Sequence, residues 1–208
     1  MNYILFDGAV RESLLPLTFT RPVADIRIGI LTIREKWELY LGLTTTTLTE
    51  EYLEIKYPMV EMEENVLIDA SILPTPELVK SIQHLSENQP LFYKDDVIAF
   101  FSKDTQEEVD FNTYEIINFT SELIQIKHTW DIFSYNDRAI QMDFDLITEG
   151  RKSQPIPKGV NVVNPENIFI EEGAKILFAT LNASSGPIYI GVNAEVMEGS
   201  VIRGPFSL

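Results

Sequence analysis

The sequence predicts an α/β domain followed by the coils of a parallel β-helix, and two patterns carry this prediction. In roughly the first 150 residues, short apolar runs alternate with stretches of helical periodicity, which favours a mostly parallel sheet covered by helices. In the last part of the chain, aliphatic side chains recur at a six-residue step, which is the period of a hexapeptide β-helix. We therefore expect two domains, residues 1–152 and 158–208, joined by a linker that contains two prolines.

Five segments of the first domain have strand character. Residues 3–6 are apolar and end at an Asp-Gly pair, as expected of a buried strand followed by a turn. Residues 44–49 form a β-branched run, and residues 65–70 are again mostly apolar. Residues 91–93 and 97–101, separated by a short polar turn, predict a β-hairpin.

Two helices have recognisable start signals. Thr32 and Glu35 have the spacing of a capping box, and Gly42 is well placed to end that helix. Thr75 is a suitable cap for a second helix, because Pro76 then occupies the first helical position. Both helices carry an apolar stripe, so we expect them to pack against the sheet.

The remaining segments are less regular. Residues 8–20 predict a loop, since prolines interrupt them, and residues 103–110 predict an acidic loop. Residues 114–119 are a further candidate strand, and residues 130–147 are mostly helical in pattern. Residues 150–159 combine prolines with polar and basic residues, so they are the best candidate for the linker.

The six-residue step has a definite structural meaning. The recurring aliphatic positions are Ile170, Ile176, Ile190, Val196 and Ile202. The residues four positions after these anchors are usually small, namely Ala174, Thr180, Ala194, Ser200 and Phe206. Each hexapeptide is expected to form one side of a triangular coil, with the anchor inside and the small residue at the corner. The last coil ends at Leu208 without the atypical polar repeat that normally caps a solenoid, so we expect an incomplete β-helix.

Composition narrows the classes of function. The chain has no cysteine, which excludes disulfides, thiolate metal sites and cysteine nucleophiles. Its net charge of −16 argues against nucleic-acid binding, which requires clustered Lys and Arg. No stretch of eighteen apolar residues and no signal peptide are present, so we expect a cytoplasmic protein without a membrane partner. Basic residues are nevertheless concentrated between Arg11 and Lys36, where a small anion can be held locally.

Two segments resemble a known family. The run Leu14-Leu15-Pro16-Leu17-Thr18-Phe19-Thr20-Arg21-Pro22, just after the first strand, resembles the opening of sugar-phosphate nucleotidyltransferases. The segment 159–170 resembles the junction at which bifunctional N-acetylglucosamine-1-phosphate uridylyltransferase/glucosamine-1-phosphate acetyltransferases enter their left-handed β-helix. The resemblance implies a Rossmann-like domain that joins a nucleoside triphosphate to a sugar 1-phosphate and releases pyrophosphate. UTP with N-acetylglucosamine 1-phosphate, or dTTP with glucose 1-phosphate, are the implied substrate pairs.

The same resemblance, together with the chemistry of polyphosphates, suggests the site. Backbone N–H groups in a turn after a strand form an anion nest, and arginine forks spread over phosphate oxygens. We expect Arg11 and Arg21 to act in catalysis. The residues expected to bind the nucleotide or the sugar phosphate are Gly8, Pro16, Leu17, Thr18 and Arg27.

The expected cofactor is Mg²⁺, and two residues are candidate ligands. Asp69 ends an apolar strand, where the family holds its magnesium; the alternative is an aspartate that only shapes the following turn. Asn136 lies in a short Asn-x-Arg segment that resembles a metal-binding segment of the uridylyltransferases; the alternative is a helix cap. His128, next to Trp130, is interpreted as a packing residue.

Alternative functions remain open at this point. The loop after the first strand is poor in glycine, and Val23 stands where the family has a lysine. These departures favour a non-catalytic module, sensing a ligand or purely structural, in front of an acyltransferase β-helix. A complete protein of this kind can be an acetyl-coenzyme-A-dependent acyltransferase, but we expect no such activity from a shortened β-helix. Self-association through residues 160–208 is also expected, because solenoid coils bury their faces by stacking.

Overall fold

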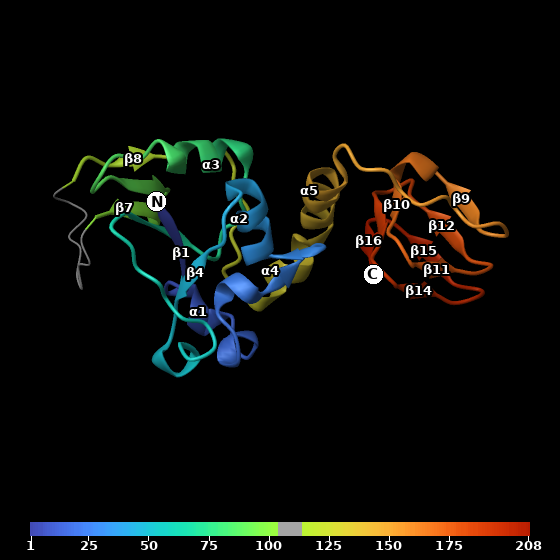
Figure 1. The fold of residues 1–208 in the computed structure, drawn as a ribbon, viewed down its shortest axis with the longest axis horizontal. Helices are drawn as coiled ribbons and strands as arrows, with labels where there is room; N and C mark the ends of the chain where they lie inside the picture. Colours follow the sequence, from blue (N-terminus) through green and yellow to red (C-terminus); the bar gives the residue numbers. More distant parts are fainter. Residues whose placement is uncertain (104–113) are drawn as a thin grey trace. The chain divides into compact units, whose positions relative to one another are not determined.

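The computed structural model describes residues 1–103 and 114–208, and the chain divides into two units. One unit comprises Met1–Ile26 and Thr32–Asp131, and the other comprises Arg27–Leu31 and Ile132–Leu208 (Figure 1). Apart from Lys103, the predicted acidic loop lies outside the described residues. No helix in the described part of the chain is both long enough and apolar enough to cross a membrane.

The first unit is built on a six-stranded sheet with the order β4-β1-β5-β7-β6-β8. Its strands are β1 (Asn2–Phe6), β4 (Thr46–Leu48), β5 (Asn65–Asp69), β6 (Pro90–Tyr93), β7 (Asp96–Ser102) and β8 (Ile117–Asn118). The predicted parallel arrangement holds for β4, β1 and β5, and β8 is parallel to β6. Strand β7 runs antiparallel to β5 and to β6, and with β6 it forms the predicted hairpin. In this sheet five strands therefore run in the same direction and β7 runs in the opposite one, so the sheet is mostly parallel, as predicted.

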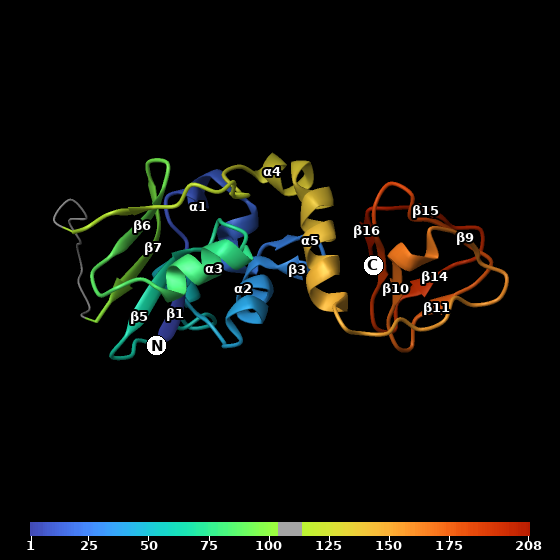
Figure 2. The same cartoon turned by 90° about the horizontal axis from the view of Figure 1, so that it is seen from above.

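Two helices of the first unit begin as their caps predict. In α2 (Ile33–Leu41), Thr32 and Glu35 form the capping box, and Gly42 ends the helix in a left-handed conformation. Helix α3 (Pro76–Gln83) begins after Thr75, whose side chain accepts the N–H of Leu78. The two helices contact each other and lie side by side in both views (Figures 1 and 2). Their apolar stripes are buried, as expected for helices that pack on the unit's core.

The segment between β1 and α2 is more ordered than the predicted loop. It contains the one-turn helix α1 (Val10–Ser13) and two 3₁₀ turns, Leu17–Phe19 and Val23–Asp25. A helix of four residues is too short to show a helical period in the sequence. Helix α1 buries Arg11 and leaves Glu12 and Ser13 exposed.

The second unit begins with a hairpin anchored by a helix. Strand β2 (Arg27–Ile28) pairs with β3 (Leu31–Thr32), and α5 spans Asn136–Thr148. Helix α4 (Thr129–Ser134) and strand β3 each include residues of both units. On α5, a carboxylate oxygen of Asp143 accepts the N–H groups of Ile30 at 2.7 Å and Leu31 at 3.1 Å. Gly29 has a positive φ of 76°, and a Cβ there would lie 2.5 Å from that same carboxylate oxygen. These contacts join residues 27–31 to α5 within this unit, and the domains 1–152 and 158–208 stay a prediction.

The rest of the second unit consists of short parallel strands in three small sheets. The strands are β9 (Asn161–Val163), β10 (Ile168–Ile170), β11 (Lys175–Ile176), β12 (Thr180–Asn182), β13 (Ile188–Ile190), β14 (Glu195–Val196), β15 (Val201–Arg203) and β16 (Phe206–Ser207). The sheets have the orders β10-β13-β16, β11-β14 and β15-β12-β9. Four of the five predicted anchors are buried, and Ile202 packs against the same cluster. Stacked parallel strands with buried anchors agree with the six-residue pattern, and the left-handed β-helix stays a prediction.

A polar cluster ties the segment after α5 to these strands. The Arg151 guanidinium lies 2.7 Å from one carboxylate oxygen of Glu171, and the Tyr189 hydroxyl donates to the other at 2.6 Å. The guanidinium also lies over the ring of Phe169, 5.1 Å from its centroid. Glu171 is buried, so these two partners satisfy a carboxylate that would otherwise be costly to bury.

Candidate functional site

A pocket of about 390 Å³, here called the sheet-edge pocket, lies at the carboxyl ends of β1 and β5. Its lining residues are Phe6, Gly8, Ala9, Val10, Ser13, Asp69, Asp96, Val97, Gln125, Lys127 and His128. Strand β1 pairs with β4 on one side and with β5 on the other, so the order of the strands reverses there. Ligands of open α/β sheets bind at such a reversal, outside the carboxyl ends of the strands.

Asp69 is the buried carboxylate of this pocket. It is the last residue of β5 and is aligned with Phe6, the last residue of β1. One carboxylate oxygen accepts the N–H of Ser71 at 2.8 Å, and the other lies 3.5 Å from the side-chain nitrogen of Gln125. Burial raises the pKa of Asp69, while the hydrogen bonds from Ser71 lower it and the nearby Asp96 raises it further. An ionised Asp69 is therefore short of positive partners, which is a common property of functional carboxylates.

The turn after β1 forms a second wall. Gly8 has a positive φ of 58°, and Ala9 follows in the right-handed helical region. A left-handed residue followed by a right-handed one directs successive N–H groups into a concave anion nest. No hydrogen bond from the N–H of Gly8, Ala9 or Val10 is found within the described residues. The turn thus has the backbone donors that a phosphate requires.

The third wall comes from a distant part of the chain. The segment 123–126 runs against residues 71–73: the N–H of Leu73 donates to the carbonyl of Ile124, and the N–H of Ile126 to that of Ser71. This pairing places Gln125 beside Asp69 and brings the following residues to the pocket. The Asp131 carboxylate then accepts the N–H groups of Lys127 and His128 at the start of α4, which fixes their backbone.

Lys127 and His128 supply an exposed cation and an exposed aromatic ring. The ammonium of Lys127 lies 2.8 Å from a carboxylate oxygen of Asp96, and both side chains are about half exposed. The imidazole of His128 stacks on the indole of Trp130, with ring centroids 4.4 Å apart. His128 therefore packs against Trp130, and it is also exposed and lines the pocket.

Arg11 points into the protein. It lies on α1 and is buried, and one guanidinium nitrogen is 2.6 Å from a carboxylate oxygen of Asp7. The other terminal nitrogen donates to the carbonyl of Thr18 at 2.5 Å and to the hydroxyl of Tyr52 at 2.8 Å. The other carboxylate oxygen of Asp7 accepts the N–H of Val23 at 2.7 Å. In this arrangement Arg11 links β1 to the turns that follow, and its donors are used by internal acceptors.

The remaining residues of the resembling motif support this interior network. The Thr18 hydroxyl donates to the carbonyl of Arg11 at 2.9 Å, and Thr18 is fully buried. Pro16 and Leu17 lie on the surface, and neither lines the sheet-edge pocket. Of the seven residues expected to act on substrate, the structure places only Gly8 in that pocket.

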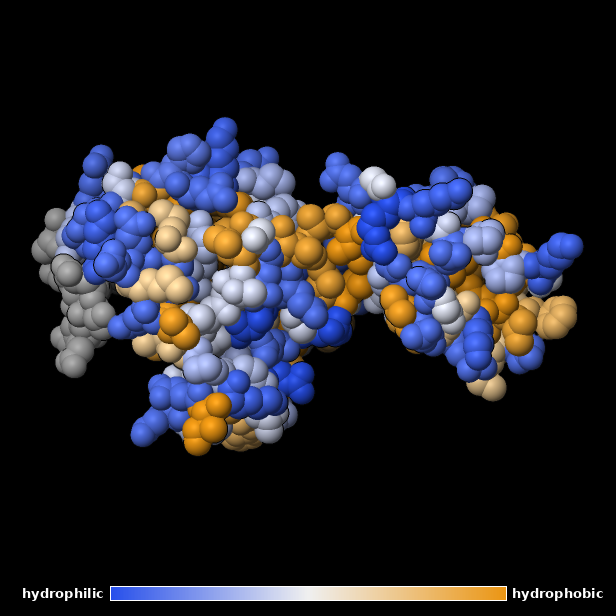
Figure 3. Space-filling model, in the orientation of Figure 1, coloured by the Kyte–Doolittle hydropathy of each residue, from blue (hydrophilic) through white to orange (hydrophobic). Residues whose placement is uncertain are grey.

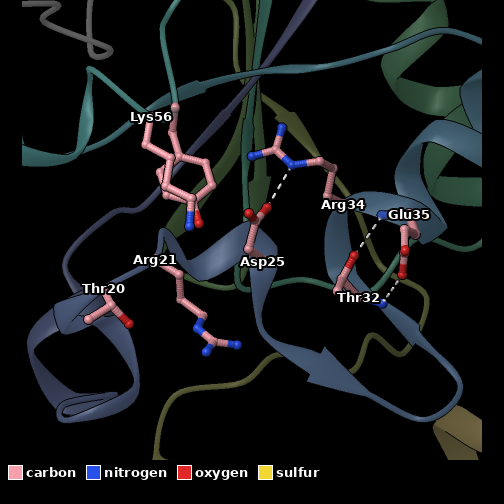
Figure 4. A pocket seen from close by; sticks show the side chains of 8 residues that line it. Thr20, Arg21, Asp25, Thr32, Arg34, Glu35 and Lys56 are labelled. Atoms are coloured by element: carbon pink, nitrogen blue, oxygen red, sulfur yellow. Dashed lines mark hydrogen bonds and ion pairs between the residues drawn. The ribbon is translucent and has the colours of Figure 1, made fainter.

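Arg21 lies at a different cavity, of about 450 Å³, here called the α2 pocket (Figure 4). Its lining residues are Thr20, Arg21, Asp25, Thr32, Arg34, Glu35, Lys56 and Tyr57. None of them lines the sheet-edge pocket. Arg27 belongs to the second unit, where its guanidinium donates to the carbonyl of Ile30.

The two candidate metal ligands have different surroundings. Asp69 faces the sheet-edge pocket, whereas the side-chain oxygen of Asn136 accepts the N–H of Gly29 at 2.8 Å within the second unit. Asn136 is the first residue of α5 rather than its cap, so it anchors the hairpin instead. Among the described residues, no group of three or more His, Cys, Asp or Glu side chains forms a ready-made metal site.

Sequence reasoning missed most of the polar residues of the sheet-edge pocket. These are Ser13, Asp96, Gln125, Lys127 and His128. Asp96 has a local signal, because it lies in the predicted hairpin turn, although the structure makes it the first residue of β7. Ser13 is placed by the short helix α1, and Gln125, Lys127 and His128 depend on the pairing of segment 123–126 with residues 71–73, which no local pattern indicates.

Comparison with known proteins bears on the family of the chain. No curated protein matches the chain. A model of the family described as sugar nucleotidyl transferase matches residues 3–152, which is 150 of the 208 residues. The match covers both strands that end at the sheet-edge pocket and the segment that forms its third wall. The chain therefore belongs to the sugar nucleotidyl transferase family.

Proposed function

We propose that the chain joins a nucleoside triphosphate to a sugar 1-phosphate in the sheet-edge pocket, with release of pyrophosphate. The observation that carries the proposal is the alignment of β1 and β5. It places the Gly8–Ala9 turn, with free backbone donors, next to the buried carboxylate of Asp69 at one edge of the sheet. Such a pair suits a reaction whose catalysis consists mainly of positioning phosphates and stabilising their charge.

The phosphates need donors and a counter-charge. The N–H groups of Gly8 and Ala9 supply donors that cost no reorganisation, because the backbone already holds them in a nest. Lys127 supplies a mobile positive charge, since an exposed ion pair with Asp96 contributes only about 0–1 kcal/mol and is easily exchanged for a phosphate. The proposed role of Lys127 is to move from Asp96 to the phosphates of the bound substrate.

The donor set of the pocket also fits Mg²⁺. This ion keeps several waters and is usually bound through one or two carboxylates together with substrate phosphates. Asp69 is the residue that would hold it, because its raised pKa reflects a buried carboxylate without a full positive partner. A bound Mg²⁺ would neutralise developing charge on the phosphates. Asn136 is not part of this proposal, since its side-chain oxygen already accepts a backbone N–H.

The substrate pairs remain those suggested by the resemblance: UTP with N-acetylglucosamine 1-phosphate, or dTTP with glucose 1-phosphate. The stacked rings of His128 and Trp130 support a planar base in the nucleotide, because an exposed aromatic pair offers a face for stacking. Arg11 and Thr18 are proposed to act indirectly, by holding the turn that presents Gly8.

The test is pyrophosphate release from a panel of triphosphates and sugar 1-phosphates in the presence of Mg²⁺. We expect activity with one pair and a loss of at least about a hundredfold in Asp69→Asn, by analogy with the removal of other electrostatic stabilisers. Asp145→Asn is the matched control, because Asp145 is exposed on α5 and does not line the pocket. Equal activity in the two variants would remove Asp69 from the site.

A second candidate function has specific support. The guanidinium of Arg11 is buried and bonded to Asp7 and Thr18, so this motif arginine is not presented to a ligand, as a ligand-sensing or structural module would allow. Nucleotide binding without turnover across the whole panel would favour this candidate over nucleotidyl transfer.

For the second unit we propose the start of a left-handed β-helix, as in the bifunctional uridylyltransferase/acetyltransferase branch of the family. Parallel strands and a buried aliphatic cluster support it. Several apolar side chains on these strands and their turns are exposed, and the surface over this segment alternates between hydrophobic and hydrophilic (Figure 3). They include Val163, Phe178, Val192, Met197 and Val201. Self-association through this segment is part of the proposal, and light scattering tests it.

A further inference from the structure

The α2 pocket has the size and the lining of a small-molecule site that the proposed reaction does not use. Its volume of about 450 Å³ lies within the range of about 300–1,000 Å³ typical of ligand pockets. It borders the start of α2 in the first unit and shares no lining residue with the sheet-edge pocket (Figure 4).

The two carboxylates of this pocket already have partners. Asp25 pairs with the Arg34 guanidinium at 2.7 Å, and that guanidinium also donates to the hydroxyls of Thr45 and Thr47. The Glu35 carboxylate accepts the N–H of Thr32 at 2.6 Å within the capping box. At the start of α2, the N–H groups of Thr32 and Glu35 are therefore satisfied by the capping box. The charge of Asp25 is therefore balanced by Arg34, and the Glu35 carboxylate is used by the capping box.

Two cations of the same pocket lack such partners. The Arg21 side chain is exposed and has no hydrogen bond or ion pair with any residue that the structure describes. The Lys56 ammonium lies over the ring of Tyr57, 5.0 Å from its centroid, and has no carboxylate within ion-pair distance in the described chain. In Figure 4, dashed lines join Arg34 to Asp25 and Thr32 to Glu35, and none reaches Arg21 or Lys56. Two unneutralised cations at one cavity are notable in a chain whose net charge is −16.

We propose that the α2 pocket binds a phosphorylated small molecule, about the size of a sugar phosphate or a mononucleotide. Arg21 supplies a fork that matches phosphate oxygens, Lys56 supplies a point charge, and the Thr20 hydroxyl next to Arg21 supplies a further donor. The site explains why an arginine of the family-like segment faces a cavity other than the one at the sheet edge. It goes beyond the proposed reaction and does not depend on it.

The experiment is isothermal titration calorimetry of the full chain at about 150 mM salt, where diffuse attraction is screened beyond about 8 Å. The probes are inorganic pyrophosphate, glucose 1-phosphate and uridine monophosphate, used separately to distinguish the sources of the phosphate. We expect saturable binding of at least one probe, weakened about tenfold or more by Arg21→Glu and by Lys56→Glu. Lys80→Glu, on the exposed side of α3, makes the same charge change and should alter the affinity by less than about twofold.

The outcomes separate this site from the sheet-edge pocket. Binding that persists in Asp69→Asn and is lost in Arg21→Glu supports the proposal, whether or not the chain turns over any substrate. Absence of binding by all three probes overturns it. Equal weakening in Arg21→Glu and Lys80→Glu also overturns it, because the attraction would then depend only on overall charge.

Discussion

Replacing Arg11 by alanine tests whether this arginine holds the fold or contacts the substrate. The guanidinium and the Asp7 carboxylate are buried to about the same degree, with side-chain exposures of 9% and 6%. Removal of one partner from such a pair leaves the other charge buried without compensation, which costs about 3–5 kcal/mol. For a chain of this size, each kcal/mol lowers Tm by about 2–4 °C, so we expect a fall of about 6–20 °C.

The assay is urea unfolding followed through the fluorescence of the fully buried Trp37. Arg21→Ala is the matched control, since it removes an exposed arginine from the same segment and should change the free energy of unfolding by less than about 0.5 kcal/mol. Asp7→Asn combined with Arg11→Ala should cost less than the sum of the two single changes, because the pair interacts directly. A loss below about 1 kcal/mol in Arg11→Ala, together with lost nucleotide affinity, would refute the structural role and restore the catalytic one.

Three further predictions concern single side chains. Burial raises the pKa of Asp69, so the stability that its protonated form provides is lost as pH rises through that pKa. Urea unfolding at several pH values should show this loss in the wild type and not in Asp69→Asn. Thr75→Ala should lower the free energy of unfolding by about 1 kcal/mol, because the N–H of Leu78 loses its acceptor, whereas Thr75→Ser should retain most of it. Burial and the Glu171 carboxylate raise the pKa of Tyr189 to about 12, so stability present below the usual pKa of 10 should be lost towards pH 12. Circular dichroism followed against pH should show this loss in the wild type and not in Tyr189→Phe. The same pH profile in both proteins would contradict the prediction.

Local signals were sufficient for the elements that local chemistry determines. The capping box of α2 and the Thr75 cap of α3 lie within four residues of the N–H groups that they satisfy, so the sequence predicts them directly. The parallel pairing of β1 with β5 also follows from the alternation of strands and helices. The antiparallel course of β7 follows from its hairpin, which the short polar turn before it already indicated.

The candidate site was harder to predict because it depends on distant pairing. The sequence predicts Asp69 as a site residue, because a carboxylate at the end of an apolar strand can be recognised from the local pattern. Gln125 and Lys127 lie more than fifty residues further along the chain, and only the backbone bonds between segments 71–73 and 123–126 bring them to Asp69. Hydrophobic periodicity contains no information about such a contact, because both segments are short and irregular.

The direction of Arg11 shows how one helical turn can reverse the interpretation of a motif. In an extended loop, Arg11 would be free to reach a phosphate, as the family resemblance suggested. In the one-turn helix α1, Glu12 and Ser13 are exposed while Arg11 is buried. A buried guanidinium must find acceptors, and it finds Asp7 and the carbonyl of Thr18, on the two sides of the turn.

This network accounts for a turn that is poor in glycine. A turn that binds phosphate must hold its N–H groups in place before the ligand arrives, since donors that reorganise during the reaction stabilise it less. Glycine lets the backbone enter the required conformation, as Gly8 does with its positive φ, but glycine does not hold the backbone there. Side-chain bonds beneath the turn can hold it. Arg11→Lys should therefore retain the charge and yet loosen the turn, because lysine lacks the fork that reaches both Asp7 and Thr18. Faster hydrogen exchange at Gly8 and Ala9 in this variant, with little change in α3, would support the argument, and uniform exchange across the unit would contradict it.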